Sequence, residues 1–207
     1  MGVVESDFNQ RCSEIESYID YLQKLESQTG FDVLLLCTMK SSALLMIYNL
    51  MESTASNSIE SIYDHLKMEK IGFISADDNL KAMVLKCAKA VNPSEIVKKM
   101  REELVDLAVA AFRKDGIFSG NVDSRKIIEI WNDYGIRRSG SYREDSLLFV
   151  KIARNDLAHG AKSFSELGKT KSVKEITDIY SSTKSLLYKA LKDVEKHIST
   201  NLKKAAA

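Results

Sequence analysis

Apolar residues fall in helix-like patterns along most of the chain, and no segment alternates apolar and polar residues long enough to indicate a strand. The only proline is Pro93, so little else in the sequence would interrupt helices. The pattern therefore predicts an all-α fold. We place helices at about 5–27, 32–54, 57–69, 76–90, 93–114, 123–134, 142–159 and 172–202.

Short polar caps mark several of the predicted helix starts. A Ser or Asn followed three positions later by an acid satisfies free backbone N–H groups and suits the helix dipole. Gly, Ser and Asn concentrate in 115–123 and 135–141, which we predict to be loops. The cap pairs are Ser75 with Asp78, Asn92-Pro93 with Glu95, Ser141 with Glu144, Ser163 with Glu166 and Ser172 with Glu175.

The 142–159 segment is apolar around most of its circumference before it ends in polar residues. It contains the run Leu147, Leu148, Phe149, Val150, Ile152 and Ala153. This composition predicts a central helix that delivers the polar residues at its end to one defined place.

Length and composition fit one globular domain. The chain has 207 residues, of which 44% are hydrophobic and 29% charged, and we assign residues 1–204 to a single domain. Residues 205–207, all alanine, are set aside as a candidate appended tail. The first residues lack the basic start and apolar stretch that are typical of an export signal, and the longest apolar patch, 33–37, is too short to span a bilayer, so neither export nor a membrane partner is expected.

The cysteines and the charge distribution add two expectations. Cys12, Cys37 and Cys87 are odd in number and widely spaced, which favours reduced, structural thiols in a cytoplasmic protein. The formal net charge is only +1, but residues 1–30 carry six acids and two bases, whereas residues 151–207 carry twelve bases and six acids. The basic half is where a polyanion would be attracted, although solvated lysine-rich faces are common in any protein.

The run Arg154-Asn155-Asp156-Leu157-Ala158-His159, followed by Gly160, carries the clearest chemistry. Arginine is well shaped to bind a phosphate, and histidine transfers protons near neutral pH. On a helix Asn155 and His159 share a face, whereas Arg154 lies about 140° around from His159. Their convergence therefore requires a swing of the arginine side chain or an end of the helix near Gly160.

The surroundings of this run resemble a known superfamily. RNDLAHG is similar to the R-x(4–6)-H signature of the HEPN superfamily, with Asn155 as the polar residue that follows the arginine. The segments 41–54 (SSALLMIYNLMEST) and 119–135, with SGNVD, RKI and YG, resemble a bacterial HEPN-nuclease-like, toxin-type subfamily. These matches lie between residues 41 and 160 and follow the order of that family.

The resemblance implies a HEPN-like multi-helix bundle that cleaves RNA without a metal or any other cofactor. Arg154 would stabilise the phosphorane, and His159 would transfer protons. Such cleavage needs two proton-transfer groups, and each chain has one motif histidine, so a homodimer would bring two motifs into one cleft. The products would be a cyclic phosphate and a 5′-hydroxyl, and a cognate antitoxin protein is an expected partner.

Other polar residues are candidates for support of the site. Tyr48, Asn49 and Glu52 interrupt an apolar run and would brace the arginine, line the RNA cleft or join a structural hydrogen-bond network. Asn121 lies in a turn, 119–121, that either offers backbone N–H groups to a phosphate or is a plain connection. Asp156 either orients Arg154 or His159 or is a solvated acid.

Competing interpretations remain at this stage. The first is a HEPN endoribonuclease that acts as a toxin or in phage defence. The second is a non-catalytic HEPN-like module that binds nucleotides, RNA or a protein, and the third is a helical adaptor.

Without the resemblance, we would interpret Arg154 as an ion-pair partner of a nearby acid such as Asp156, and His159 as a helix-end histidine bonded to a carbonyl. No P-loop, Rossmann glycine pattern or His/Cys cluster supports NTP hydrolysis, dinucleotide redox or zinc chemistry.

Overall fold

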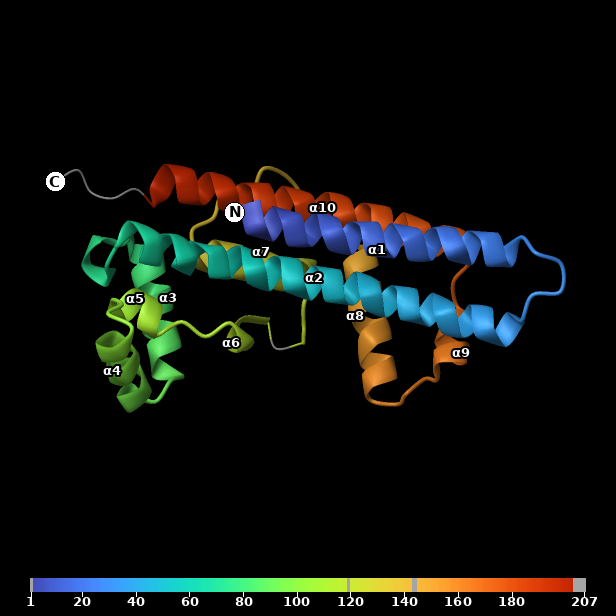
Figure 1. The fold of residues 1–207 in the computed structure, drawn as a ribbon, viewed down its shortest axis with the longest axis horizontal. Helices are drawn as coiled ribbons and strands as arrows, with labels where there is room; N and C mark the ends of the chain where they lie inside the picture. The colour runs from blue at the N-terminus through green and yellow to red at the C-terminus, as the bar shows by residue number, and fades with distance from the viewer. Residues whose placement is uncertain (1, 119, 143–144, 203–207) are drawn as a thin grey trace.

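The computed structural model describes residues 2–118, 120–142 and 145–202, and these residues form helices and loops with no strand among them. The long helices α1 (Gly2–Glu26), α2 (Val33–Glu69) and α10 (Val173–Asn201) lie alongside one another (Figure 1). The predicted all-α fold class is confirmed. The candidate tail at 205–207 lies outside the described residues.

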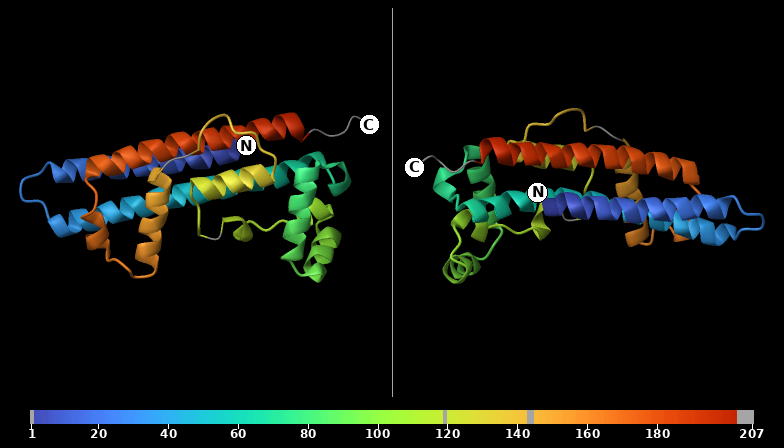
Figure 2. Two further views of the ribbon diagram at one scale, coloured as in Figure 1. Left: turned by 180° about the vertical axis from the view of Figure 1, so that it is seen from behind. Right: turned by 45° about the horizontal axis from the view of Figure 1, so that its top comes forward.

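The shorter helices pack around α2. Helix α8 runs steeply across α2, and α7 lies along it on the side seen from behind in Figure 2. The small helices η1 and α3–α5 gather near one end of α2, and α9 lies near the other. Their bounds are η1 (Phe73–Ser75), α3 (Asp78–Lys89), α4 (Pro93–Glu102), α5 (Leu107–Ala110), α6 (Asp115–Phe118), α7 (Ser124–Asp133), α8 (Asp145–Ala158) and α9 (Phe164–Gly168).

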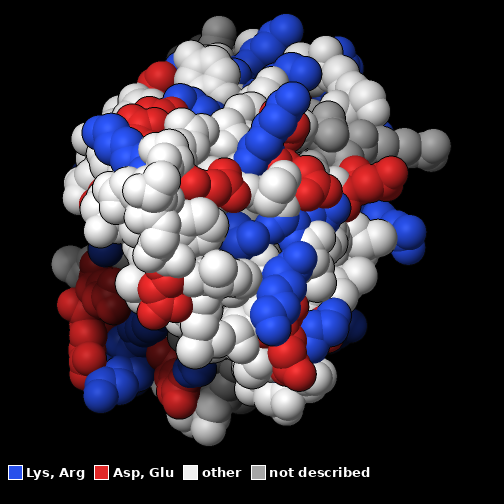
Figure 3. All heavy atoms as spheres, turned by 90° about the vertical axis from the view of Figure 1, so that its right-hand side faces the viewer, with Lys and Arg blue, Asp and Glu red and all other residues white. Residues whose placement is uncertain are grey.

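Ion pairs between α1 and α10 neutralise part of the charge asymmetry that is seen along the sequence. Lys184 pairs with Glu16 at 2.6 Å, and Lys192 pairs with Glu5 at 3.1 Å, so basic residues of α10 face acidic residues of α1. At the end of the molecule shown in Figure 3, the two signs are interspersed with uncharged surface. The excess of bases in 151–207 therefore does not translate directly into a surface for polyanions.

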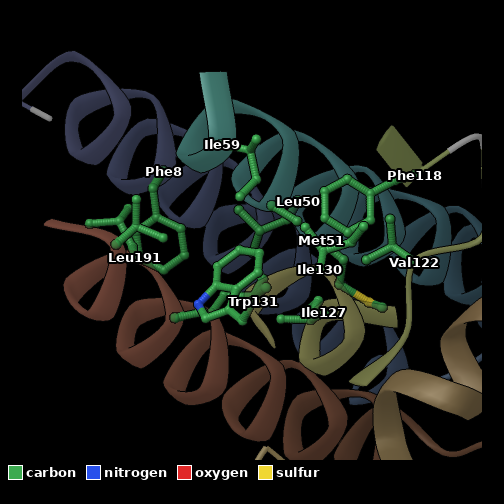
Figure 4. Close-up of a cluster of buried hydrophobic side chains, with 14 of the residues drawn as sticks. Phe8, Leu50, Met51, Ile59, Phe118, Val122, Ile127, Ile130, Trp131 and Leu191 are labelled. Atoms are coloured by element: carbon green, nitrogen blue, oxygen red, sulfur yellow. The ribbon is translucent and has the colours of Figure 1, made fainter. Parts of the chain in front are cut away.

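The core is built from side chains that are far apart in the sequence. Figure 4 shows Phe8 of α1, Leu50 of α2, Trp131 of α7 and Leu191 of α10 in one cluster, and all four are almost fully buried. Burial of this much apolar surface is the main favourable term in folding. Because α7 inserts Trp131 into this cluster, the aromatic residue serves packing.

Helix α2 is the central helix, which corrects the expectation for 142–159. It packs against α1, α5, α6, α8, α9 and α10, whereas α8 buries Leu147, Val150 and Ala153 and leaves Ile152 about half exposed. By length and composition alone α2 would also suffice to cross a membrane, yet half of its most apolar window is buried against other helices. The buried half of this window packs within the fold.

The predicted break between residues 54 and 57 is wrong, because α2 continues through them. Polar side chains in this stretch bond to carbonyls of the preceding turn: Ser58 Oγ donates to Thr54 O at 2.7 Å, and Ser61 Oγ donates to Ser58 O at 2.7 Å. A hydroxyl satisfied in this way can be buried inside a helix. The cluster of Ser, Thr and Asn therefore does not end the helix.

Other helix boundaries differ from the prediction in identifiable ways. The predicted 93–114 helix ends at Glu102, and Leu104 adopts a left-handed backbone conformation with a φ of 52°. Asp106 then accepts N–H groups from Ala108 and Phe73, which starts α5 and ties it to η1. Asp77, rather than Ser75, caps α3.

The remaining cap predictions have clear outcomes. Asn92 caps α4, and Ser163 and Ser172 form full capping boxes with Glu166 and Glu175. The pair of Ser141 with Glu144 falls partly outside the described residues. The box at Ser163 starts α9, a short helix that the sequence analysis did not place.

Helix α9 is held closely against the beginning of α2. Ser41 Oγ donates to Phe164 O at 2.6 Å, and the buried Lys40 Nζ donates to Lys171 O at 2.7 Å. A Cβ added at Gly168 would lie 1.8 Å from the carbonyl oxygen of Cys37. Only glycine permits this approach, because no side-chain movement can relieve a clash with backbone.

We predict that Gly168→Ala lowers the free energy of unfolding by about 1–3 kcal/mol, the usual cost of overpacking. Thermal unfolding followed by circular dichroism measures the change. Gly140→Ala is the matched control, since an added Cβ meets nothing within 4 Å there. Equal stability of the two variants would contradict the close packing of α9 on α2.

Candidate functional site

The polar run at the end of α8 is shaped by a specific helix termination. Gly160 has a φ of +69°, its N–H donates to Leu157 O at 3.3 Å, and Ala161 N–H donates to Asp156 O at 2.8 Å. This is the hydrogen-bond pattern of a Schellman motif, which requires a left-handed residue directly after the C-cap. His159 is that C-cap residue, so the helix ends immediately after the signature.

Arg154 lies on the side of α8 that faces α2. Its guanidinium carbon is 5.3 Å from the centre of the Tyr48 ring, and its Nη1 donates to Asn155 Oδ1 at 3.1 Å. Within the part of the chain that the structure describes, no carboxylate lies within ion-pair distance of this guanidinium. An aromatic face and an amide thus orient the arginine while its charge stays unneutralised.

Tyr48 and Glu52, one turn apart on α2, hold the segment that precedes α7. Glu52 Oε1 accepts the N–H of Gly120 at 3.0 Å, and the Tyr48 hydroxyl accepts the N–H of Val122 at 3.4 Å. Burial raises the pKa of the Tyr48 phenol above its ordinary value, so the ring under Arg154 stays neutral. The two residues combine the bracing and structural roles considered for them.

Gly120 lies close to the guanidinium of Arg154. It has a φ of +72°, and an added Cβ would lie 3.2 Å from Nη2 of Arg154. Its N–H is bonded to Glu52, and the N–H of Asn121 is bonded to Phe118 O at 3.0 Å. Of the two alternatives for this turn, these bonds favour a plain connection, because the N–H groups of Gly120 and Asn121 already have acceptors; Ser119 lies outside the described residues.

A second polar link fastens α7 to α8. Asp123 caps α7 through the N–H of Lys126 and also forms an ion pair with Lys151 of α8. Burial works against the charged carboxylate, but the bond from Lys151 and the N–H bonds of α7 outweigh it and lower the pKa of Asp123 below its ordinary value. Lys151 and Arg154 are three residues apart and therefore share a face of α8.

His159 and Asp156 do not join the group around Arg154. His159 is exposed, and its side chain makes no hydrogen bond with any residue that the structure describes. Asp156 forms an ion pair with Lys162 at 2.7 Å. The expected alternatives of an Arg154–Asp156 ion pair and of a carbonyl-bonded histidine are thus both absent from the described residues.

A polar cavity of about 630 Å³ adjoins the arginine across Gly120. Asn49 and Glu52 of α2 contribute to its wall, as does Gly120 itself, whereas Arg154 and His159 do not. Two basic residues of the wall are already paired, Arg11 with Asp7 at 2.9 Å and Lys114 with Glu60 at 2.7 Å. The full lining is Arg11, Asn49, Glu52, Ser53, Ser56, Asn57, Lys114, Phe118 and Gly120.

Sequence reasoning missed three residues of this region: Arg11, Lys114 and Lys151. Arg11 and Lys114 come from α1 and from the segment before α6, and no local pattern relates them to the Arg/His run. Lys151 had a signal, because its spacing of three from Arg154 places both cations on one helix face. Among the described residues, no group of three or more His, Cys, Asp or Glu side chains is arranged to hold a metal.

A family model described as HEPN_MAE_28990-like HEPN matches residues 3–202. The chain belongs to this HEPN family. Searches of curated proteins and of solved structures each found no match.

We predict that the Asp123–Lys151 pair stabilises the fold by about 1–2 kcal/mol at neutral pH, between the values for exposed and fully buried pairs. Asp123→Asn retains a good N-cap and removes the charge, and Lys151→Met retains the apolar stem. Together with the double variant they form a thermodynamic cycle, measured by denaturant unfolding.

The pH dependence of this coupling has a definite sign. Because folding lowers the pKa of Asp123, the stabilisation is complete above the ordinary carboxyl pKa of about 3.9 and is lost as the pH falls through the folded-state value. The coupling measured at pH 7 should therefore shrink toward zero in strong acid. A coupling that is absent at pH 7, or that grows in acid, would refute the assignment.

Proposed function

We propose that this protein is a metal-independent endoribonuclease of the HEPN type. Membership of a HEPN family supports an RNase-type module at the level of class. The observation that carries the proposal to this chain is the environment of Arg154. Its guanidinium rests on Tyr48 and bonds Asn155, with no carboxylate of the described residues in ion-pair contact, so its positive charge remains available to a phosphate.

The chemistry uses the nucleophile that RNA itself supplies. The 2′-oxygen attacks the adjacent phosphorus, the new O2′–P bond forms and the P–O5′ bond breaks, which leaves a cyclic phosphate and a 5′-hydroxyl. One histidine accepts the proton of the 2′-hydroxyl, and a second donates a proton to the departing O5′. Arg154 binds the non-bridging oxygens, whose negative charge increases in the phosphorane.

A symmetric dimer supplies the second histidine in this proposal. Within one chain His159 is exposed at the end of α8. Among the described residues its side chain forms no hydrogen bond with a second histidine. A two-fold axis near His159 would place two copies of the motif around one phosphate. The cavity beside Gly120, with Asn49 and Glu52 in its wall, lies where a flanking nucleotide of the substrate would be received.

The biological role we infer is that of a toxin or phage-defence RNase held in check by a cognate antitoxin protein. RNA cleavage without sequence readout would damage the host cell, so an inhibitor that covers the exposed end of α8 is the expected partner. Asp156 and its partner Lys162 lie next to His159 and would be part of the covered surface.

We predict that Arg154→Ala and His159→Ala each reduce RNA cleavage by about 10²-fold or more, because the first removes phosphorane stabilisation and the second removes proton transfer. The assay incubates purified protein with total RNA in EDTA and identifies the product ends. Arg101→Ala is the control, since Arg101 is an exposed arginine of α4 with no ion pair among the described residues.

Unchanged cleavage by His159→Ala would end the assignment of ribonuclease activity to this motif. Specific RNA binding by the wild type without any cleavage would favour the alternative, a non-catalytic HEPN-like module that binds nucleotides, RNA or a protein. Thermal unfolding of each variant separates loss of activity from loss of fold.

We further predict that the active protein is a homodimer, measurable by sedimentation velocity. Mixtures of Arg154→Ala and His159→Ala chains then probe how the groups are shared. Partial recovery of activity would mean that each cleft can work with an arginine and a histidine from different chains, and no recovery would mean that both copies of each are needed. A strictly monomeric protein that cleaves RNA would contradict the dimer.

A further inference from the structure

The connection between α7 and α8 forms a second polar site on α10, away from the end of α8. The described part of this connection arches over α10 (Figures 1 and 2). Ser139 N–H donates to Asp193 Oδ2 at 2.8 Å, and the Tyr142 hydroxyl donates to the same oxygen. Asp193 is only 4% exposed, so the connection is fastened to α10 through a buried carboxylate.

A pocket of about 440 Å³ lies between this connection and the last turns of α10. Arg137, Arg138 and Ser139 line it from the connection. Lys196, His197, Thr200 and Asn201 line it from α10, with Asp193 as the acidic residue of the wall. The volume is within the range of pockets that bind small molecules, roughly 300–1,000 Å³.

The positive charges of this pocket are unpaired among the described residues. Arg137, Arg138 and Lys196 are exposed, and none of them forms an ion pair with a residue that the structure describes. Lys184 and Lys192 of the same helix, by contrast, pair with acids of α1. The pocket therefore concentrates three cations around space that no acidic side chain of the described residues fills.

The carboxylate of Asp193, the acidic residue of the wall, already accepts hydrogen bonds from the connection. One oxygen of Asp193 accepts both the N–H of Ser139 and the hydroxyl of Tyr142. Burial, followed by the bond to this carboxylate, raises the pKa of Tyr142, so the phenol keeps its proton. The role of Asp193 is accordingly to position the loop, and the arginines remain free to bind an anion.

His197 is a buried residue of the pocket wall. Asn201 Nδ2 can only donate, so its 3.1 Å contact with His197 Nδ1 makes that nitrogen an acceptor and assigns the ring proton to Nε2. Burial lowers the pKa of His197, which keeps the ring neutral. A neutral imidazole in the wall adds no charge of its own.

We propose that this pocket binds a polyphosphate group, that is, two or three adjacent phosphates with their oxygens bridged by Arg137, Arg138 and Lys196. Neighbouring guanidinium groups bind phosphate oxygens bidentately, and the ammonium adds a point charge. The same chemistry is offered by the tail of a nucleoside triphosphate and by consecutive phosphates of an RNA strand. The site shares no residue with the Arg154 region and does not depend on RNA cleavage.

Isothermal titration calorimetry at physiological salt tests this proposal with two probes. Inorganic tripolyphosphate represents a free polyphosphate, and a 2′-O-methylated RNA oligonucleotide, which lacks the nucleophile for cleavage, represents a strand. The test variant is Arg138→Ala with Lys196→Ala. Its control is Arg101→Ala with Lys189→Ala, which removes the same net charge from exposed residues without ion pairs among the described residues.

We expect the test variant to weaken binding of at least one probe by 10-fold or more, while the control stays within about 2-fold of the wild type. Weakened tripolyphosphate binding assigns a free polyphosphate, and weakened binding of the RNA probe alone assigns a strand; either supports the site. Arg137→Ala alone should show a smaller loss in the same direction. Equal affinities of test and control variants, or no binding of either probe to the wild type, would overturn the proposal.

Discussion

Burial of α2 is the constraint on which the rest of the structure depends. This 37-residue helix carries a long set of apolar side chains, and α1, α10, α8 and α9 pack against it and bury many of them. Its polar residues are accommodated by internal bonds, as with Ser58 to the Thr54 carbonyl, or by bonds to the covering elements, as with Lys40 to Lys171 O. The bond from Lys40 thereby holds the connection between α9 and α10 against α2.

The candidate site follows from that arrangement. Tyr48 and Glu52 are part of the central helix. The loop that they bind and the arginine that rests on Tyr48 are therefore held in place against α2. His159 has no such support, because it lies where the Schellman motif has already ended α8. One chain therefore orders the phosphate-binding half of the proposed chemistry and leaves the proton-transfer half at an exposed helix end, where a second copy can approach.

The packing of the helices also decides which basic residues have an acidic partner. Lysines of α10 that face α1 are neutralised by its glutamates, whereas Arg137, Arg138 and Lys196 lie beyond the reach of those acids. Arg154 is likewise held without a carboxylate. A net charge of +1 is therefore compatible with two separate places where positive charge is free to meet an anion.

The sequence by itself determined the helical class, most helix starts and the chemistry of the Arg154 to His159 run, because periodicity, caps and motif residues are local properties. The continuity of α2 through its serines, the split after Glu102 and the packing of Gly168 on Cys37 were decided by tertiary contacts. So were the partners of Arg154 and the pairing of Asp123 with Lys151. Such features depend on which surfaces meet in space, and spacing along one chain carries no direct record of that.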